Sequence, residues 1–306
     1  MTKRVAALDC GTNALRLLIA ERDAAGNVVD VLRRMETVRL GEGVDATGEL
    51  SEAALARTFA CFEEYQREIV AFDVRKLRCV ATSATRDARN REVFTNGVLE
   101  RIRVEPEVIS GREEAELSFA GATMGLRDLA RPALIIDLGG GSTEFVLGDR
   151  TPEFAWSTNI GCVRMTERHL AGDPPGDEEL AQSIADINAA IDEAAQHVPL
   201  ERAEAIVGLA GTVTTVAAHA LGLDRYDAEV LHGARLPSEQ ILAAAADLVA
   251  MSRAERAALP FMHPGRVDVI GGGALVLAEI VRRVGLPELV VSEHDLLDGI
   301  AYSLLS

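Results

Sequence analysis

Short apolar segments alternate along the chain with longer segments whose apolar residues recur at helical spacing. The segment that follows Ser51 places Leu55, Phe59, Phe62 and Ile69 on one face, and Ser51 is suited to cap its N-terminus. Further helices are predicted over residues 83–90, 90–101, 112–126, 177–197, 212–221, 238–259, 274–284 and 295–305. Strands are predicted over residues 3–10, 15–20, 28–33, 77–81, 107–109, 133–136, 144–147, 205–209 and 289–291. This alternation predicts the α/β class with mixed sheets.

One motif occurs twice. Residues 7–13 read Ala-Leu-Asp-Cys-Gly-Thr-Asn, and residues 135–142 read Ile-Ile-Asp-Leu-Gly-Gly-Gly-Ser. The two aspartates lie 128 residues apart (137 − 9), close to half of the chain. The repeat predicts two duplicated lobes whose turns face a shared cleft, with one domain over residues 1–126 and the other over residues 127–294.

Composition excludes several classes of protein. The 306 residues carry 48 acidic and 31 basic side chains, a formal charge of −17, so the overall field repels nucleic acids and anionic membranes. No apolar run approaches the ~20 residues of a spanning helix, and the start leaves no room for the apolar region of a signal peptide. Isolated cysteines without metal spacing indicate reduced thiols, and we expect a cytoplasmic protein.

The two repeated turns are suited to phosphate. Gly11, Thr12 and Asn13 in the first copy, and Gly139, Gly140, Gly141 and Ser142 in the second, offer backbone amides and hydroxyls without bulky side chains. Asp9 and Asp137 would repel a phosphate unless Mg²⁺ lay between them, so both are candidate metal ligands. The alternative is a pair of ordinary hairpin turns, which the shared register disfavours.

Glu144 begins the strand after the second turn. Strand alternation would place it on the same face as Ser142, so it is a further candidate ligand. The alternative is an exposed carboxylate at a strand edge.

A third candidate lies where a strand meets the hydroxyl-rich segment Thr82–Thr85. Ser83 and the amides of a helix N-terminus could bind an anion, and Arg86 could grip phosphate oxygens. In the alternative interpretation, Thr82 or Ser83 only caps the helix and Arg86 is a surface charge.

A fourth candidate is the acidic start of the helix after Ser110. Ser110 and Glu113 have the spacing of a capping box, so Glu113 should fold back onto the cap. Glu114 points about 100° away around the helix and needs no local partner, which leaves it able to deprotonate a water. Alternatively, both carboxylates only complement the helix dipole.

Two later glycine clusters complete the candidates. Gly211 and Thr212 lie in another strand-to-helix turn, and Gly271–Gly273 open a helix. Each could bind an anion or only allow close packing.

The segments 8–18, 82–88, 109–115 and 136–144 together resemble motifs of the exopolyphosphatase / guanosine pentaphosphate phosphohydrolase family. The resemblance implies two actin-like, ribonuclease-H-like domains of the acetate-and-sugar-kinase superfamily, with a C-terminal helix near residues 295–306 packing on the first domain. It implies that Glu114 is the general base and that Asp137 and Glu144 are magnesium ligands. It also implies two phosphate loops, 11–13 and 139–142, with Arg86 as a phosphate clamp. Ala14 and the segment Asp295–Gly299 depart from the family pattern.

The leading hypothesis is release of terminal orthophosphate from inorganic polyphosphate, with Mg²⁺, or Mn²⁺ in its place, as cofactor. The first alternative is hydrolysis of guanosine pentaphosphate or a nucleoside triphosphate. The second alternative is a non-catalytic sensor that binds polyphosphate or a (p)ppGpp-type nucleotide. A kinase of the same fold would have to exclude the water that Glu114 is placed to recruit. The resemblance also implies a homodimer, and we expect neither nucleic-acid nor membrane partners.

Overall fold

The computed structural model describes residues 4–126 and 128–305. The chain forms two compact units, of which unit 1 is Met1–Gly121 with Leu296–Ser306 and unit 2 is Ala122–Asp295. The first change of unit lies five residues before the boundary predicted at 126/127. Within the described stretches, no helix is both long and apolar enough to cross a membrane.

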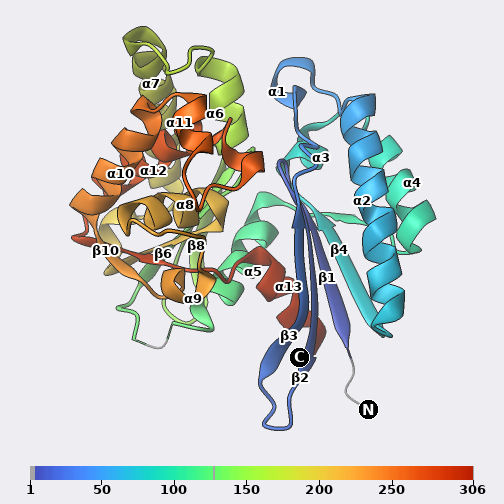
Figure 1. The fold of residues 1–306 in the computed structure, drawn as a ribbon. Coiled ribbons are helices and arrows are strands. Elements are labelled where there is room, and N and C mark those ends of the chain that lie inside the picture. Colours follow the sequence, from blue (N-terminus) through green and yellow to red (C-terminus); the bar gives the residue numbers. More distant parts are fainter. Residues whose placement is uncertain (1–3, 127, 306) are drawn as a thin grey trace. The chain divides into compact units, whose positions relative to one another are not determined.

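Unit 1 is built on a five-stranded mixed sheet (Figure 1). Its strand order is β3-β2-β1-β4-β5, in which β1, β2 and β3 are antiparallel neighbours and β4 and β5 run parallel to β1. The strands are β1 (Val5–Cys10), β2 (Leu15–Arg22), β3 (Val28–Glu36), β4 (Lys76–Ala81) and β5 (Glu107–Val108). The helices are α1 (Val44–Thr47), α2 (Glu52–Ala71), α3 (Ser83–Asp87), α4 (Arg91–Ile102), α5 (Gly111–Thr123) and α13 (Leu296–Leu305).

Alternation along β1 divides the core of unit 1 between the two faces of the sheet. Ala6, Leu8 and Cys10 belong to the cluster that also contains the buried residues of α2 and α4. Val5 and Ala7 belong to the opposite cluster, with the apolar face of α13. Ser51 caps α2 by accepting a hydrogen bond from the amide of Ala54 at 3.2 Å, as the sequence predicted.

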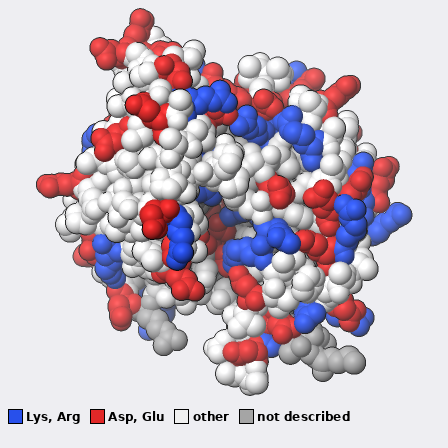
Figure 2. All heavy atoms as spheres, viewed as in Figure 1, with Lys and Arg blue, Asp and Glu red and all other residues white. Residues whose placement is uncertain are grey.

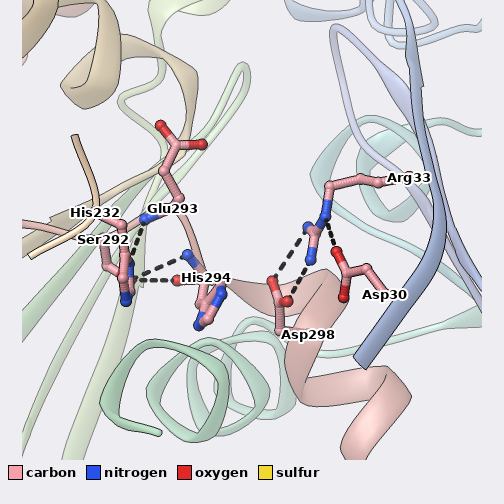
Figure 3. A network of polar contacts seen from close by, with 7 residues as sticks. All are labelled: Asp30, Arg33, His232, Ser292, Glu293, His294 and Asp298. Atoms are coloured by element: carbon pink, nitrogen blue, oxygen red, sulfur yellow. Dashed lines mark hydrogen bonds and ion pairs between the residues drawn. The ribbon is translucent and has the colours of Figure 1, made fainter. Parts of the chain in front are cut away.

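The C-terminal helix α13 is held on this sheet by polar contacts as well as by packing. Arg33 of β3 donates from Nη2 to Asp298 Oδ1 at 2.5 Å and from Nε to Asp30 Oδ2 at 2.8 Å (Figure 3). A Cβ at Gly299 would lie 2.1 Å from the carbonyl oxygen of Leu117, so only glycine permits this approach to α5. Asp298, which departs from the family pattern, therefore has a local structural partner.

Unit 2 contains a six-stranded sheet in the order β10-β11-β9-β6-β7-β8. The strands are β6 (Ala133–Leu138), β7 (Thr143–Gly148), β8 (Pro152–Thr158), β9 (Ala205–Leu209), β10 (Arg235–Pro237) and β11 (Glu288–Val291). The helices are α6 (Cys162–His169), α7 (Asp177–His197), α8 (Ala210–Ala220), α9 (Ala228–Leu231), α10 (Ser238–Ala250), α11 (Arg253–Ala257) and α12 (Ile270–Val284), with short 3₁₀ turns at Leu200–Arg202 and Pro264–Arg266. One apolar cluster joins the inner strands to α6, α7, α8, α10 and α12.

The repeat predicted from sequence is present in the topology of both units. In unit 1, β1 pairs antiparallel with β2 and parallel with β4. In unit 2, β6 pairs antiparallel with β7 and parallel with β9. The strands β8-β7-β6-β9-β11 of unit 2 therefore follow the same order as β3-β2-β1-β4-β5 of unit 1, which is the ribonuclease-H-like order. The fold is a duplicated actin-like one.

Acidic and basic side chains are interspersed on the surface of each unit (Figure 2). Many of them form exposed ion pairs, such as Arg101 with Glu63 and Arg283 with Asp192. Pairs of this kind contribute little to stability. In this view, the acidic residues are spread over the surface and are not gathered into one acidic face.

Candidate active site

The two repeated turns have the same backbone geometry. The amide of Gly11 donates to the carbonyl of Ala14 at 3.0 Å, and the amide of Gly139 donates to the carbonyl of Ser142 at 3.0 Å. Each turn joins the central strand of its sheet to the next antiparallel strand. Both therefore lie at the carboxyl end of a central strand, where open α/β sheets bind their ligands.

The carbonyls of the second turn are held by the start of α6. The amides of Cys162 and Val163 donate to the carbonyls of Gly139 and Gly140 at 3.0 and 2.9 Å. A Cβ at Gly161 would lie 2.4 Å from the carbonyl oxygen of Gly140, so this contact requires glycine. Among the residues with described positions, the amides of Gly140 and Gly141 have no acceptor. This turn therefore presents backbone donors, as an anion site requires.

The first turn is held in a comparable way by the segment after β3. The amide of Arg39 donates to the carbonyl of Asn13 at 2.9 Å, and the amide of Gly41 donates to the carbonyl of Thr12 at 2.8 Å. Thr12 is buried, and its hydroxyl lies 2.8 Å from that of Ser83. The structure thus brings Thr12 and Ser83, which are distant in sequence, together at the end of the sheet.

Ser83 begins α3, which ends at Asp87 instead of Asn90 as predicted. Thr82 precedes this helix, and its side chain makes no capping hydrogen bond. The alternative in which Thr82 only caps the helix is therefore wrong. The hydroxyl of Ser83 contacts Thr12 of the first turn.

The two carboxylates of unit 2 face each other across neighbouring strands. Asp137 of β6 is the register partner of Glu144 of β7. Directly opposed residues place their Cβ atoms about 4.5–5.5 Å apart and on one face. Both side chains are buried, at 7% and 1% exposure, and Ser157 donates from its hydroxyl to Glu144 Oε1 at 2.7 Å. Ser142 lies in the turn rather than in β7, so the predicted strand alternation between Ser142 and Glu144 does not apply.

This pair fits what Mg²⁺ requires from a protein. Mg²⁺ is commonly bound by one or two carboxylates, with phosphate oxygens and water completing an octahedron. The described part of the chain contains no cluster of three or more potential ligands among its histidine, cysteine and acidic residues. Asp137 and Glu144 would therefore hold the ion jointly with its phosphate ligand.

The corresponding position in unit 1 has a different chemistry. Asp9 is the register partner of Arg16, which donates to Asp9 Oδ2 from Nε at 2.9 Å and from Nη2 at 2.5 Å. One turn of the repeat thus carries two carboxylates at its base and the other carries an ion pair. This difference favours unit 2 as the source of the metal ligands.

Glu114, for which the sequence predicted no local partner, has a partner from a distant part of the chain. It is buried at 6% exposure, and Arg86 donates from Nη1 both to Glu114 Oε2 at 3.0 Å and to the carbonyl of Ile109 at 3.0 Å. Local spacing gave no sign of this contact, because the partner lies on α3, 28 residues earlier, and not on the same helix. The two residues predicted to act as base and clamp are therefore in direct contact.

Glu113 differs from its prediction as well. Its amide donates to the hydroxyl of Ser110 at 3.2 Å, which is the first half of a capping box. Its carboxylate instead accepts from Arg78 Nη2 at 2.7 Å, because an arginine on β4 is within reach.

The later glycine clusters lie in the first turns of two helices. Gly211 and Thr212 are in α8, and a Cβ at Gly211 would lie 2.5 Å from the guanidinium carbon of Arg266. Gly271–Gly273 are in α12, which begins at Ile270 and not at Ala274 as predicted. A Cβ at Gly273 would lie 2.6 Å from Thr212 Oγ1, so close packing accounts for this glycine.

Sequence reasoning missed several residues that support the site: Arg16, Ser157, Arg164 and Arg266. Arg164 donates from Nε to the carbonyl of Gly141 at 2.7 Å, and Arg266 donates from Nη1 to Thr215 Oγ1 at 2.9 Å. A signal was available for Arg16, because aligning Asp9 with Asp137 also aligns residue 16 with Glu144. Ser157 and Arg164 lie on β8 and α6, which were not predicted, and Arg266 ends a short 3₁₀ turn that was not predicted either.

Comparisons with known proteins agree with this architecture. A model of the Ppx/GppA phosphatase family matches residues 18–306. The chain is 47% identical to exopolyphosphatase 2 of Mycobacterium tuberculosis, with 98% of each protein covered. It is 28% identical to the guanosine-5'-triphosphate,3'-diphosphate pyrophosphatase of Pseudoalteromonas atlantica, over 98% of this chain and 58% of that protein.

Solved structures give the same result. A crystal structure of an exopolyphosphatase-like protein has a TM-score of 0.95 at 44% identity, with 98% of each chain covered. The Ppx/GppA family member of Aquifex aeolicus has a TM-score of 0.81 at 29% identity, covering 100% of this chain and 98% of that one. With its duplicated fold, its two glycine turns and a family match over nearly its whole length, the chain belongs to the Ppx/GppA phosphatase family.

Proposed function

We propose that the protein is an exopolyphosphatase that releases terminal orthophosphate from inorganic polyphosphate. The observation that carries the proposal is the opposed, buried pair Asp137 and Glu144 beside a glycine turn with available amides. The 47% identity to exopolyphosphatase 2 over the full chain supports polyphosphate as the substrate class.

In the proposed reaction, Glu114 accepts a proton from a water molecule. The water oxygen forms a bond to the terminal phosphorus, and the bridging P–O bond breaks, leaving a chain one phosphate shorter. Arg86 orients the carboxylate of Glu114, since its Nη1 is fixed between that carboxylate and the carbonyl of Ile109. Positioning of this kind and preorganised donors account for most of the catalysis in phosphoryl transfer.

Unit 2 contributes the charge-neutralising part of the proposed site. Asp137 and Glu144 would hold Mg²⁺, or Mn²⁺ in its place, and the ion would supply positive charge to the phosphate oxygens. The amides of Gly140 and Gly141 would donate to the same oxygens.

A second candidate is hydrolysis of guanosine pentaphosphate, favoured by the similarity to pyrophosphatases of that nucleotide. Phosphate release measured with Mg²⁺ on short polyphosphate, long polyphosphate, guanosine pentaphosphate and ATP separates the candidates. We expect the highest kcat/KM with polyphosphate. A higher value with guanosine pentaphosphate would overturn the substrate assignment, and binding of polyphosphate without any release would indicate a sensor instead.

A further inference from the structure

Unit 2 contains a polar cavity whose lining includes neither the pair Asp137 and Glu144 nor the glycine turn 139–142. It has a volume of about 240 Å³ and lies among the loop after α6, helix α11 and the first turn of α12. Its lining includes two arginines, two aspartates and two glycines: Arg253, Arg256, Asp173, Asp268, Gly271 and Gly272.

Arg256 is a buried cation without an ion pair. Its side chain is 6% exposed, and it donates from Nε to the carbonyl of Leu248 at 2.7 Å and from Nη2 to the carbonyl of Val249 at 3.1 Å. These two bonds close the C-terminal turn of α10. No carboxylate forms an ion pair with Arg256 in the described part of the protein, and Nη1 donates to no described atom. Burial lowers the pKa of Arg256.

The guanidinium also packs against the positive end of a helix. A Cβ at Gly271 would lie 2.9 Å from Arg256 Nη2 and 3.3 Å from its Cζ, so the missing side chain lets the group approach the first turn of α12. The amides of Gly271 and Gly272 have no acceptor among the described residues, and the first bond of this turn runs from Gly273 to Val269 at 3.2 Å. A desolvated cation and a helix N-terminus repel each other, and an anion bound between them would offset this repulsion.

The carboxylates of the cavity are engaged by the other arginine. Asp268 Oδ1 pairs with Arg253 Nη2 at 2.5 Å, and Asp173 Oδ1 accepts from the amide of Arg253 at 2.7 Å. Both carboxylates act on Arg256 only at longer range. They moderate the positive potential of the cavity without supplying a direct partner for Arg256.

We propose that this cavity binds a small tetrahedral oxyanion of the phosphate class, held by Arg256 Nη1 and the amides of Gly271 and Gly272. An anion at this point contacts both the helix N-terminus and an arginine, the combination that favours phosphate binding in proteins. The site is separate from the pair Asp137 and Glu144 and requires no metal.

Selenate, which scatters anomalously and resembles phosphate in shape, is the probe. Crystals of the intact chain soaked in selenate should show an anomalous peak within hydrogen-bond distance of Arg256 Nη1 and Gly271 N. In solution, selenate titration in EDTA should give a weaker or absent site in Arg256→Gln. Arg202→Gln, which removes an exposed arginine elsewhere in unit 2, should bind as the unmodified protein does.

A second variant keeps the test decisive if Arg256→Gln fails to fold. Asp173→Asn retains the oxygen that accepts from Arg253 and removes one negative charge from an exposed position. It should tighten selenate binding about 3- to 5-fold, as expected for one charge several ångströms away in a hydrated cavity. No peak in the cavity, together with unchanged affinity in Asp173→Asn, would overturn the proposal. A peak whose occupancy depends on neither residue would indicate an adventitious ion only, and would overturn it as well.

Discussion

Removing one carboxylate from the opposed pair of unit 2 should uncouple the protein from Mg²⁺ without disturbing its sheet. Glu144→Gln keeps the shape of the side chain and an oxygen that can accept from Ser157. Asp137→Asn makes the same change on the neighbouring strand. Each variant leaves one charged ligand where the proposed site requires two.

The expected size of the effect follows from linkage. A ligand at 100 times its Kd stabilises the folded state by about 2.7 kcal/mol. Unit 2 has 174 residues (Ala122–Asp295), and for a domain of that size each kcal/mol shifts Tm by roughly 2–4 °C, so Mg²⁺ should raise its Tm by about 5–10 °C. If losing one ligand weakens binding about 100-fold, the same Mg²⁺ concentration contributes only about 0.4 kcal/mol, a shift of roughly 1 °C.

The assay is thermal unfolding in EDTA and across a Mg²⁺ titration, with metal affinity measured independently by calorimetry. Asp149→Asn is the matched control, because it removes an exposed carboxylate just after β7. The Tm of the unmodified protein and of Asp149→Asn should rise alike with Mg²⁺, and the Tm of the two site variants should rise by only roughly 1 °C. Wild-type Mg²⁺ affinity in both Glu144→Gln and Asp137→Asn would refute the assignment of these ligands.

Three further predictions concern the scaffold of unit 1. Asp298→Asn removes the charge that pairs with Arg33, and should lower the free energy of unfolding by about 1–3 kcal/mol, measured by denaturant titration. An unchanged unfolding midpoint would show that α13 is held by apolar packing alone. Thr12→Val leaves the buried hydroxyl of Ser83 without its 2.8 Å partner, and should lower the free energy of unfolding by about 1–3 kcal/mol. It should also raise the KM for polyphosphate, and an unchanged KM would show that Thr12 does not belong to the phosphate site. Burial raises the pKa of Cys61 to about 12, so its thiol should resist alkylation at pH 8 until the protein is unfolded, and rapid labelling of the native chain would contradict this burial.

The parts of the fold that sequence predicted well are those in which local and tertiary preferences agree. Helix α7 and strand β9 lie at the predicted residues, because apolar periodicity and flanking turns coincide there. Strand β8 was missed, since its residues are half-buried and its Trp156 stacks on His197 of α7 instead of entering the core. Helix α6 is only eight residues long and buries only Cys162, Val163 and Met165, which are too few apolar positions to mark a helix in the sequence.

The residues of the candidate site likewise differ in how far the sequence alone predicts them. The glycine turns and their aspartates were found because the motif is repeated, and repetition is visible without any structure. The contact between Arg86 and Glu114 could not be predicted, since it depends on how α3 and α5 meet at the end of β4. The opposition of Asp137 and Glu144 followed only once the hairpin register was known.

The most direct test of the central claim compares two neighbouring glutamates. Steady-state phosphate release from polyphosphate should fall about 10²- to 10⁴-fold in kcat for Glu114→Gln, with little change in KM, because the variant keeps its shape but cannot accept a proton from water. Glu113→Gln, which loses only the half-exposed contact with Arg78, should retain the wild-type kcat. Equal kcat values for Glu114→Gln and the unmodified protein would contradict the account.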